Sequence, residues 1–164
     1  MKRFLSILVL GTFLLACEKG KLTSKEAVSV VDIPPSEAAE LIRAGEVLVL
    51  DVRTTEEYRE GHITPSLLIP HQEVGERKKE ILAYGDRPIL VYCRSGHRSA
   101  IAAEELIKKG FKKVCNLAGG KKAFLSYIEG HPEYKDLWCT KKCPGICGYG
   151  RRKGGCGCGG TADR

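Results

Sequence analysis

Residues 88–110, PILVYCRSGHRSAIAAEELIKKG, decide the fold that we expect of this chain. The first six residues form a continuous apolar run of the kind found in strands that are buried on both faces. Residues 99–110 predict a helix that ends at a glycine. On that helix Ala102, Leu106 and Ile107 share one face. A buried strand joined by a short loop to an amphipathic helix is the repeating unit of an α/β sheet.

The same alternation runs through the middle of the chain. The Pro34-Pro35 pair separates the first strand from the first helix, and Thr54 with Glu57 forms a capping box at the second helix. Alternation of this kind predicts an α/β fold of three layers, with a central parallel sheet flanked by helices. Strands are expected at 28–33, 47–52, 66–70, 88–93 and 111–117, and helices at 36–45, 54–61, 72–85, 99–110 and 119–130.

Cys93 ends the strand within this opening stretch, at the edge of the sheet where ligands bind in parallel α/β proteins. The amides of the following loop can turn inward around the sulfur, and the next helix points its positive end at it. Gly96 lets the backbone curl this tightly. These effects lower the pKa of a thiol and favour a nucleophile. The loop residues concerned are Arg94, Ser95, Gly96, His97 and Arg98.

The alternative for Cys93 is a buried structural thiol. Cys115, in KVCNL, has no charged loop after it and is assigned that structural role.

Three blocks together resemble a single-domain rhodanese, a sulfurtransferase: VLVLDVRTTEEYREGHI, PILVYCRSGHRSAIAAEELIKKGF and VCNLAGG. The resemblance covers roughly residues 28–128. It departs from the family at GHITPSLLIP, where Pro-Gly-Ala is usual, which puts the local turn in doubt but not the fold.

The resemblance implies that Cys93 takes a sulfane sulfur from a donor such as thiosulfate and carries it as a persulfide to a thiol or cyanide. No metal or organic cofactor is needed for this step. Substrate contacts would come from Arg94, Ser95, Gly96, His97, Arg98 and Ser99, and structural support from Asp51, Arg53 and His62.

Two other functions stay open. Dual-specificity phosphatases and some arsenate reductases use a C-x5-R loop, whereas Cys93 to Arg98 is C-x4-R, a smaller ring that suits one sulfur atom better than an oxyanion. The body could instead be a binding scaffold that acts through its C-terminal tail, since a fold does not fix a function.

Residues 1–16 read as a signal peptide, with Lys2 and Arg3 ahead of a short apolar stretch. The ending LLAC resembles the bacterial lipobox, which implies lipidation of Cys17; an ordinary signal peptide is the alternative. Residues 17–27 would then be a tether. We expect a protein that is lipid-anchored on the extracytoplasmic side of a membrane of the bacterial cell envelope.

Residues 129–164 form a Cys/Gly-rich extension in which no helix or strand is predicted beyond about Gly130. Three interpretations compete: disulfides, a metal held by thiolates, or a relay that accepts sulfur from Cys93. Five is an odd number, so pairing within the extension leaves a thiol over. The candidates are Cys139, Cys143, Cys147, Cys156 and Cys158.

The formal net charge of +7 is concentrated near the two ends, which leaves the body nearly neutral. Nucleic acid is therefore not an expected partner, because such a surface would need cations gathered over one whole face.

Overall fold

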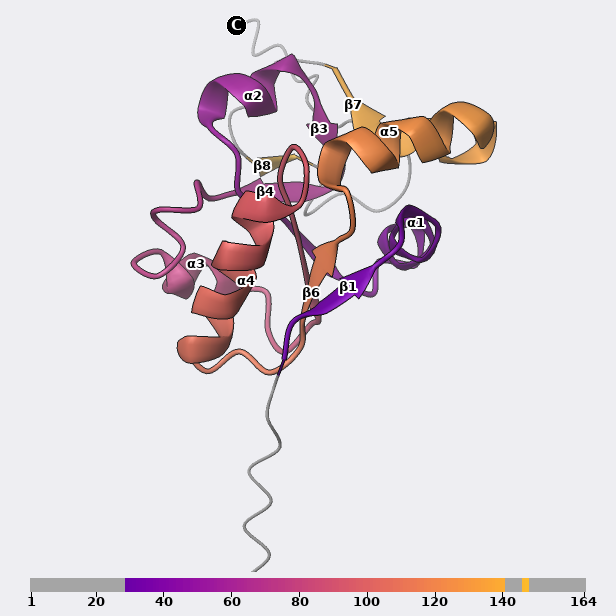
Figure 1. Ribbon diagram of the computed structural model, residues 1–164. Helices are drawn as coiled ribbons and strands as arrows, with labels where there is room; N and C mark the ends of the chain where they lie inside the picture. Colours follow the sequence, from indigo (N-terminus) through magenta and orange to yellow (C-terminus); the bar gives the residue numbers. More distant parts are fainter. Residues whose placement is uncertain (1–28, 141–145, 148–164) are drawn as a thin grey trace, which may run out of the picture.

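The computed structural model describes residues 29–140 and 146–147 (Figure 1). Its central sheet has the strand order β1-β6-β5-β2-β4-β8, and the first five strands are parallel. This confirms the predicted parallel α/β sheet. The strands are β1 (Val31–Ile33), β2 (Leu48–Asp51), β4 (Ser66–Leu68), β5 (Ile89–Tyr92), β6 (Val114–Leu117) and β8 (Ile146–Cys147); the helices are α1 (Pro35–Ala44), α2 (Thr55–Glu60), α3 (Lys78–Leu82), α4 (His97–Lys108) and α5 (Gly120–Gly130).

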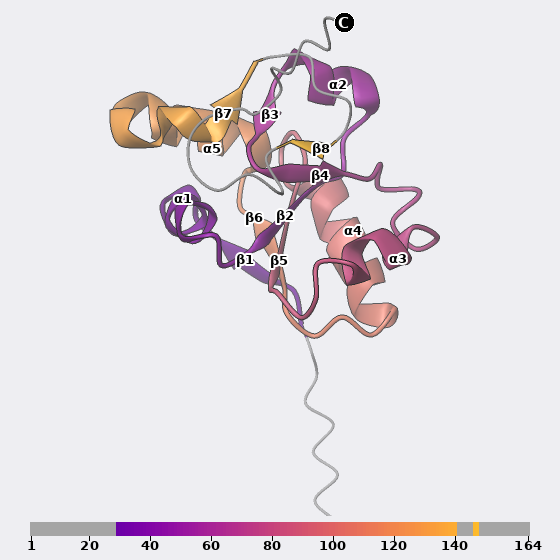
Figure 2. The ribbon, with the colours of Figure 1, turned by 180° about the vertical axis from the view of Figure 1, so that it is seen from behind.

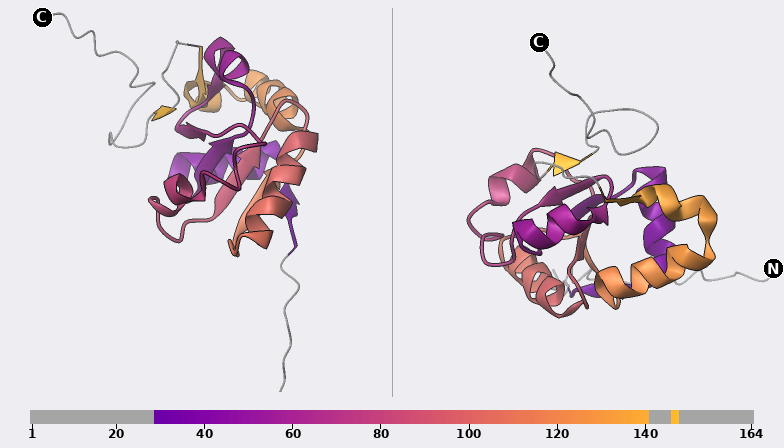
Figure 3. Two further views of the ribbon diagram at one scale, coloured as in Figure 1. Left: turned by 90° about the vertical axis from the view of Figure 1, so that its left-hand side faces the viewer. Right: turned by 90° about the horizontal axis from the view of Figure 1, so that it is seen from above.

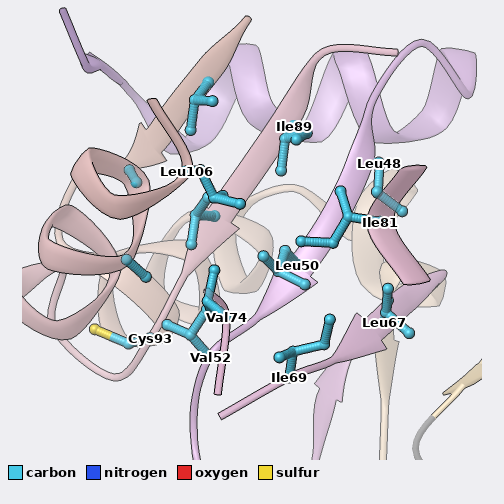
Figure 4. Packing of buried hydrophobic residues seen from close by; sticks show 14 residues of the cluster. Leu48, Leu50, Val52, Leu67, Ile69, Val74, Ile81, Ile89, Cys93 and Leu106 are labelled. Carbon is cyan, nitrogen blue, oxygen red and sulfur yellow. The ribbon is translucent and has the colours of Figure 1, made fainter. Parts of the chain in front are cut away.

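The helices cover both faces of the sheet, as the sequence predicts (Figure 2). On one face α4 and α3 pack through Ala103, Leu106 and Ile81. On the other face α1 and α5 pack through Ile42 and Phe124. The central strands are buried on both sides, which explains their uninterrupted apolar sequences. Figure 4 shows Cys93 at the margin of the apolar cluster that α4 and α3 form with this face of the sheet.

Two helices, α4 and α3, depart from their predicted bounds by more than one residue at an end. α4 begins at His97 rather than at residue 99, because Gly96 caps it in the left-handed region with φ 99°. α3 is limited to Lys78–Leu82. The residues before it form turns, in which the Glu73 amide donates to the carbonyl of Pro70 over 2.8 Å.

The prediction that no helix or strand follows Gly130 is wrong for the described residues. A 3-10 helix, η1, spans Pro132–Leu137, and β7 (Trp138–Cys139) pairs antiparallel with β3 (His62–Ile63). β8 pairs antiparallel with β4 (Figure 3). Composition misses these elements because their apolar partners belong to the body: Leu137 and Cys139 are buried against it.

The predicted signal peptide and tether, including Cys17, lie outside the described residues. Within residues 29–140 and 146–147 no helix combines the length and the apolar character that crossing a bilayer requires.

The first turn of α5 holds the loop that follows β5. The amides of Lys121 and Lys122 donate to the carbonyls of Cys93 (2.8 Å) and Arg94 (3.2 Å). Gly120, at φ 57°, makes this approach possible, since a Cβ there would lie 2.5 Å from the Cys93 carbonyl oxygen. Helix α5 is therefore fixed by these two hydrogen bonds to the loop that follows the central strand β5.

We expect Gly120→Ala to destabilise the protein more than Gly45→Ala does. Both glycines have a positive φ, so each alanine costs about 1–2 kcal/mol in backbone strain. Only the alanine at position 120 also collides with the Cys93 loop, whereas position 45 has open space. The collision should cost roughly a further 1–3 kcal/mol. Urea unfolding of both variants measures the difference, and equal losses would show that the contact with the loop is not tight.

A candidate active site at Cys93

Cys93 directly follows β5, at the start of the loop that leads into α4 (Figure 4). The Gly96 amide donates to its sulfur over 3.2 Å, and the Ser99 hydroxyl oxygen lies 3.5 Å from the same atom. The residue as a whole is only 1% exposed. Burial raises the pKa of the thiol, but hydrogen bonds from the Ser99 hydroxyl and from the amides of Ser95, Ser99 and Gly96 outweigh burial and lower the pKa.

Cys115 has the opposite character. It lies part-way along β6, where burial raises the pKa of its thiol and the nearby carboxylate of Glu37 raises it further. The pKa values of Cys93 and Cys115 therefore shift in opposite directions, and of the two only Cys93 is stabilised as a thiolate.

The other predicted site residues of this loop differ in how far their side chains are exposed. The side chains of Arg94, Ser95 and His97 are exposed, while Ser99 is buried beneath the loop. Arg98 is half-buried and pairs with Glu57 through two hydrogen bonds, of 2.7 and 2.8 Å. Its guanidinium is thus held by α2, although the sequence analysis expected it to face the substrate.

Glu57 is a site residue that the sequence analysis assigned only to helix capping. Its carboxylate does cap α2, where it accepts from the Thr54 amide over 3.2 Å, and it also pairs with Arg98. Hydrogen bonding to Arg98 is the main reason why the pKa of Glu57 falls to about 2. The capping box could be recognised in the sequence, but no sequence pattern predicts that α2 and α4 pack together and bring Glu57 to Arg98.

Asp51, Arg53 and His62 support this end of the sheet from below. Asp51 and Arg53 form a fully buried salt bridge, and Arg53 also donates to the carbonyls of Glu57 and Gly61. Tyr92, which the sequence analysis did not single out, donates its hydroxyl to Asp51 and accepts from the amide of Ile63. The tyrosine thereby links the buried ion pair to the strand that carries Cys93.

His62 stacks on Tyr58, with ring centroids 3.8 Å apart, and its Nδ1 lies 2.9 Å from the Tyr58 carbonyl oxygen. Burial lowers the pKa of the imidazole. The ring therefore belongs to the support of α2 and β3.

The cysteine-rich extension is described only in part. Cys139 is buried opposite His62 in the β7–β3 pair, and Cys147 stands opposite Ser66 in the β8–β4 pair. Among the described residues no three His, Cys, Asp or Glu side chains gather as metal ligands would. Cys143, Cys156 and Cys158 lie outside the described residues, so the disulfide, metal and relay interpretations stay predictions.

Comparison with known proteins points to the same kind of site as this geometry, a cysteine held by loop amides at the end of a central parallel strand. Residues 34–127 match the sequence profile of the rhodanese-like domain. The chain belongs to the rhodanese-like family. Thiosulfate sulfurtransferase 18 of Arabidopsis thaliana is 36% identical over 118 residues, which are 64% of this rhodanese-like chain and 85% of that protein.

Two further relatives agree. Thiosulfate sulfurtransferase GlpE of Coxiella burnetii is 34% identical over 96 residues, 58% of this chain and 85% of that protein. The crystal structure of a rhodanese-related protein from Thermoplasma volcanium matches with a TM-score of 0.52 and 31% identity, covering 59% of this chain and 92% of the other. At the level of the family, the chain is a rhodanese-type sulfurtransferase.

Glu57→Gln should reduce the stability of this rhodanese-like domain at neutral pH by about 1–2 kcal/mol, because glutamine keeps the capping contact but loses the charge that pairs with Arg98. The pKa of Glu57 is lowered from 4.5 to about 2. The stability that it contributes is therefore complete above pH 4.5 and is lost as the pH falls toward 2.

Urea unfolding of the wild type and the variant at pH 7 and at pH 2 tests this difference. Glu80→Gln is the matched control, since Glu80 pairs with Arg77 on the exposed surface and should change stability little. A gap between wild type and Glu57→Gln that is the same at both pH values would contradict the assignment.

Proposed function

We propose that this protein moves a sulfane sulfur from a small anionic donor such as thiosulfate to a thiol or cyanide, through a persulfide on Cys93. The observation that carries the proposal is the Cys93 sulfur itself, which accepts from the Gly96 amide and has a lowered pKa despite its burial. A thiolate is the form that attacks a sulfane sulfur.

The reaction balances without a further reagent. The Cys93 thiolate attacks the outer sulfur of thiosulfate; a new sulfur–sulfur bond forms while the old one breaks, and its electron pair leaves with sulfite. The persulfide anion on Cys93 is then attacked at its outer sulfur by cyanide or a thiolate acceptor. The sulfur departs with the acceptor, as thiocyanate when cyanide is used, and the Cys93 thiolate is restored.

The loop supplies the electrostatics of both steps. Its amides point at the sulfur and stabilise an anion there whether it is a thiolate or a persulfide. Arg94 is exposed in the same loop and would attract the dianionic donor, whereas the charge of Arg98 is largely taken up by Glu57. His97 is also exposed at the first position of α4.

Cys93→Ser should abolish sulfur transfer from thiosulfate to cyanide, with a loss of at least about a thousandfold in kcat, because the nucleophile itself is removed. Mass spectrometry after a single exposure to thiosulfate should show one added sulfur on the wild type and none on the variant. Cys115→Ser is the matched control and should retain both the persulfide and the activity.

A wild-type protein that gains no sulfur under these conditions would favour the alternative, a binding module that acts through its extension. Turnover of a phosphomonoester or of arsenate by the wild type, lost in Cys93→Ser, would favour an oxyanion enzyme instead.

We also propose that Cys17 is lipidated and anchors the protein on the extracytoplasmic side of a membrane in the cell envelope. The sequence LLAC supports this proposal. The described chain enters the sheet at the amino end of β1, while Cys93 follows the carboxyl end of β5, which runs parallel to β1 in the same sheet.

Cys17→Ala should move the protein from the membrane fraction to the soluble fraction of an expressing bacterium, because a diacylated cysteine is what holds it. The mass of the mature wild-type protein should exceed that of the unmodified chain beginning at Cys17 by the lipid group. Cys115→Ser, treated in parallel, should stay in the membrane fraction, and an unmodified mature N-terminus would refute the anchor.

A further inference from the structure

A continuous chain of hydrogen bonds leads from the edge of the sheet to the candidate nucleophile. Asp32 on β1 and Asn116 on β6 are register partners, and the Asn116 side-chain amide donates to the Asp32 carboxylate over 2.7 Å. On its other side the Asn116 oxygen lies 2.6 Å from the Ser99 hydroxyl, which in turn lies 3.5 Å from the Cys93 sulfur. Asn116 and Ser99 are buried, while Asp32 is exposed.

The Ser99 hydroxyl cannot serve all of its neighbours. It has one proton and three acceptors within reach, namely the Asn116 oxygen at 2.6 Å, the Gly96 carbonyl at 3.0 Å and the Cys93 sulfur at 3.5 Å. The shortest of these contacts is the one to Asn116. The stabilisation that Ser99 offers a thiolate is therefore largest when its proton leaves Asn116.

Asp32 decides which end of the Asn116 amide faces Ser99. An ionised carboxylate only accepts hydrogen bonds, so Asn116 must turn its NH2 group toward Asp32 and its oxygen toward Ser99. With the oxygen in that place, Ser99 has to donate to it, because the buried oxygen would otherwise be left unsatisfied. The charge of Asp32, on the edge strand β1, thus fixes the direction of the hydrogen bonds from Asn116 and from Ser99.

We propose that Asp32 and Asn116 are positioning residues that draw the Ser99 proton toward Asn116 and so restrain the acidity of the Cys93 thiol. In the native state the Ser99 hydroxyl then gives the thiolate only part of the stabilisation that it could, beside the hydrogen bonds from the loop amides. This inference rests on the proposed function only in taking Cys93 as the reacting thiol.

Removal of the carboxylate releases the chain. In Asp32→Ala the Asn116 amide is free to rotate and to donate its NH2 group to the Ser99 oxygen. The Ser99 proton can then turn to the sulfur, and a hydrogen bond to a charged sulfur is stronger than one to a neutral carbonyl. The other ionisable groups near Cys93 stay in place: the Arg98–Glu57 pair between α4 and α2, and Arg94 and His97 in the loop.

The test is the pH dependence of Cys93 alkylation by iodoacetamide, which does not require sulfur transfer. It is followed by mass spectrometry at Cys93 in the full chain. Asp32→Ala should lower the pKa of Cys93 by about one pH unit and so raise the alkylation rate roughly tenfold below that pKa. The same substitution in a Ser99→Ala background should leave the pKa unchanged, because the chain is already broken at Ser99.

The double-mutant cycle separates a chain of hydrogen bonds from a simple charge effect. A fall in pKa that is equal with and without the Ser99 hydroxyl would mean that Asp32 acts through space, and the inference would be wrong. A rise in pKa in Asp32→Ala would also overturn it, since Asn116 would then be aiming Ser99 at the sulfur. Glu37→Gln is the control. It removes an exposed carboxylate of α1 that is not a member of this hydrogen-bond chain, and it should leave the pKa of Cys93 unchanged.

The outcome is independent of the proposed function. A Cys93 that takes up no sulfur from thiosulfate but shows the Ser99-dependent fall in pKa would remove the sulfurtransferase proposal and leave the positioning chain intact. Normal sulfur transfer with an unchanged Cys93 pKa in Asp32→Ala would leave the sulfurtransferase proposal intact and remove the positioning chain.

Discussion

The contact between the first turn of α5 and the loop after β5 orients the chemistry of this protein. The carbonyls of Cys93 and Arg94 point outward, because the amides of Lys121 and Lys122 bind them. A peptide group with its oxygen turned outward has its N–H on the other side, and the amides of the loop are therefore free to face the sulfur. The two left-handed glycines that start α5 and the one that caps α4 make this arrangement sterically possible.

The thiol is stabilised as an anion against the effect of its own burial. Withdrawal from water raises a thiol pKa, and Cys115 shows that outcome on a neighbouring strand. At Cys93 a set of fixed dipoles reverses it. Apart from the Ser99 hydroxyl these donors are backbone amides, and amides need no reorganisation when charge moves to the outer sulfur of a persulfide. The buried Asp51–Arg53 pair and Tyr92 contribute indirectly, since they hold the strand end and α2 in register with the loop.

The sequence predicted the sheet, its helices and the place of Cys93, because each depends on local patterns: apolar runs, capping residues and the glycines that end helices. It did not predict the partners of these residues across the fold. Glu57 looked like a helix cap, and only the packing of α2 beside α4 brings it to Arg98. Asp32 and Asn116 lie far apart in the chain, and although Asn116 falls in the VCNLAGG block, nothing there points to Asp32; the register of β1 with β6 makes them neighbours. The strands after Gly130 were missed because composition measures only what a segment can bury by itself.

The antiparallel strand β8 has a consequence for how copies of this protein behave toward one another. A parallel sheet that stopped at β4 would offer an open row of peptide groups, a template on which a second sheet can grow. Here a two-residue strand of the protein's own extension pairs with β4 at that edge. A segment too poor in apolar residues to fold alone thus serves as a guard against edge-to-edge aggregation at one side of the sheet.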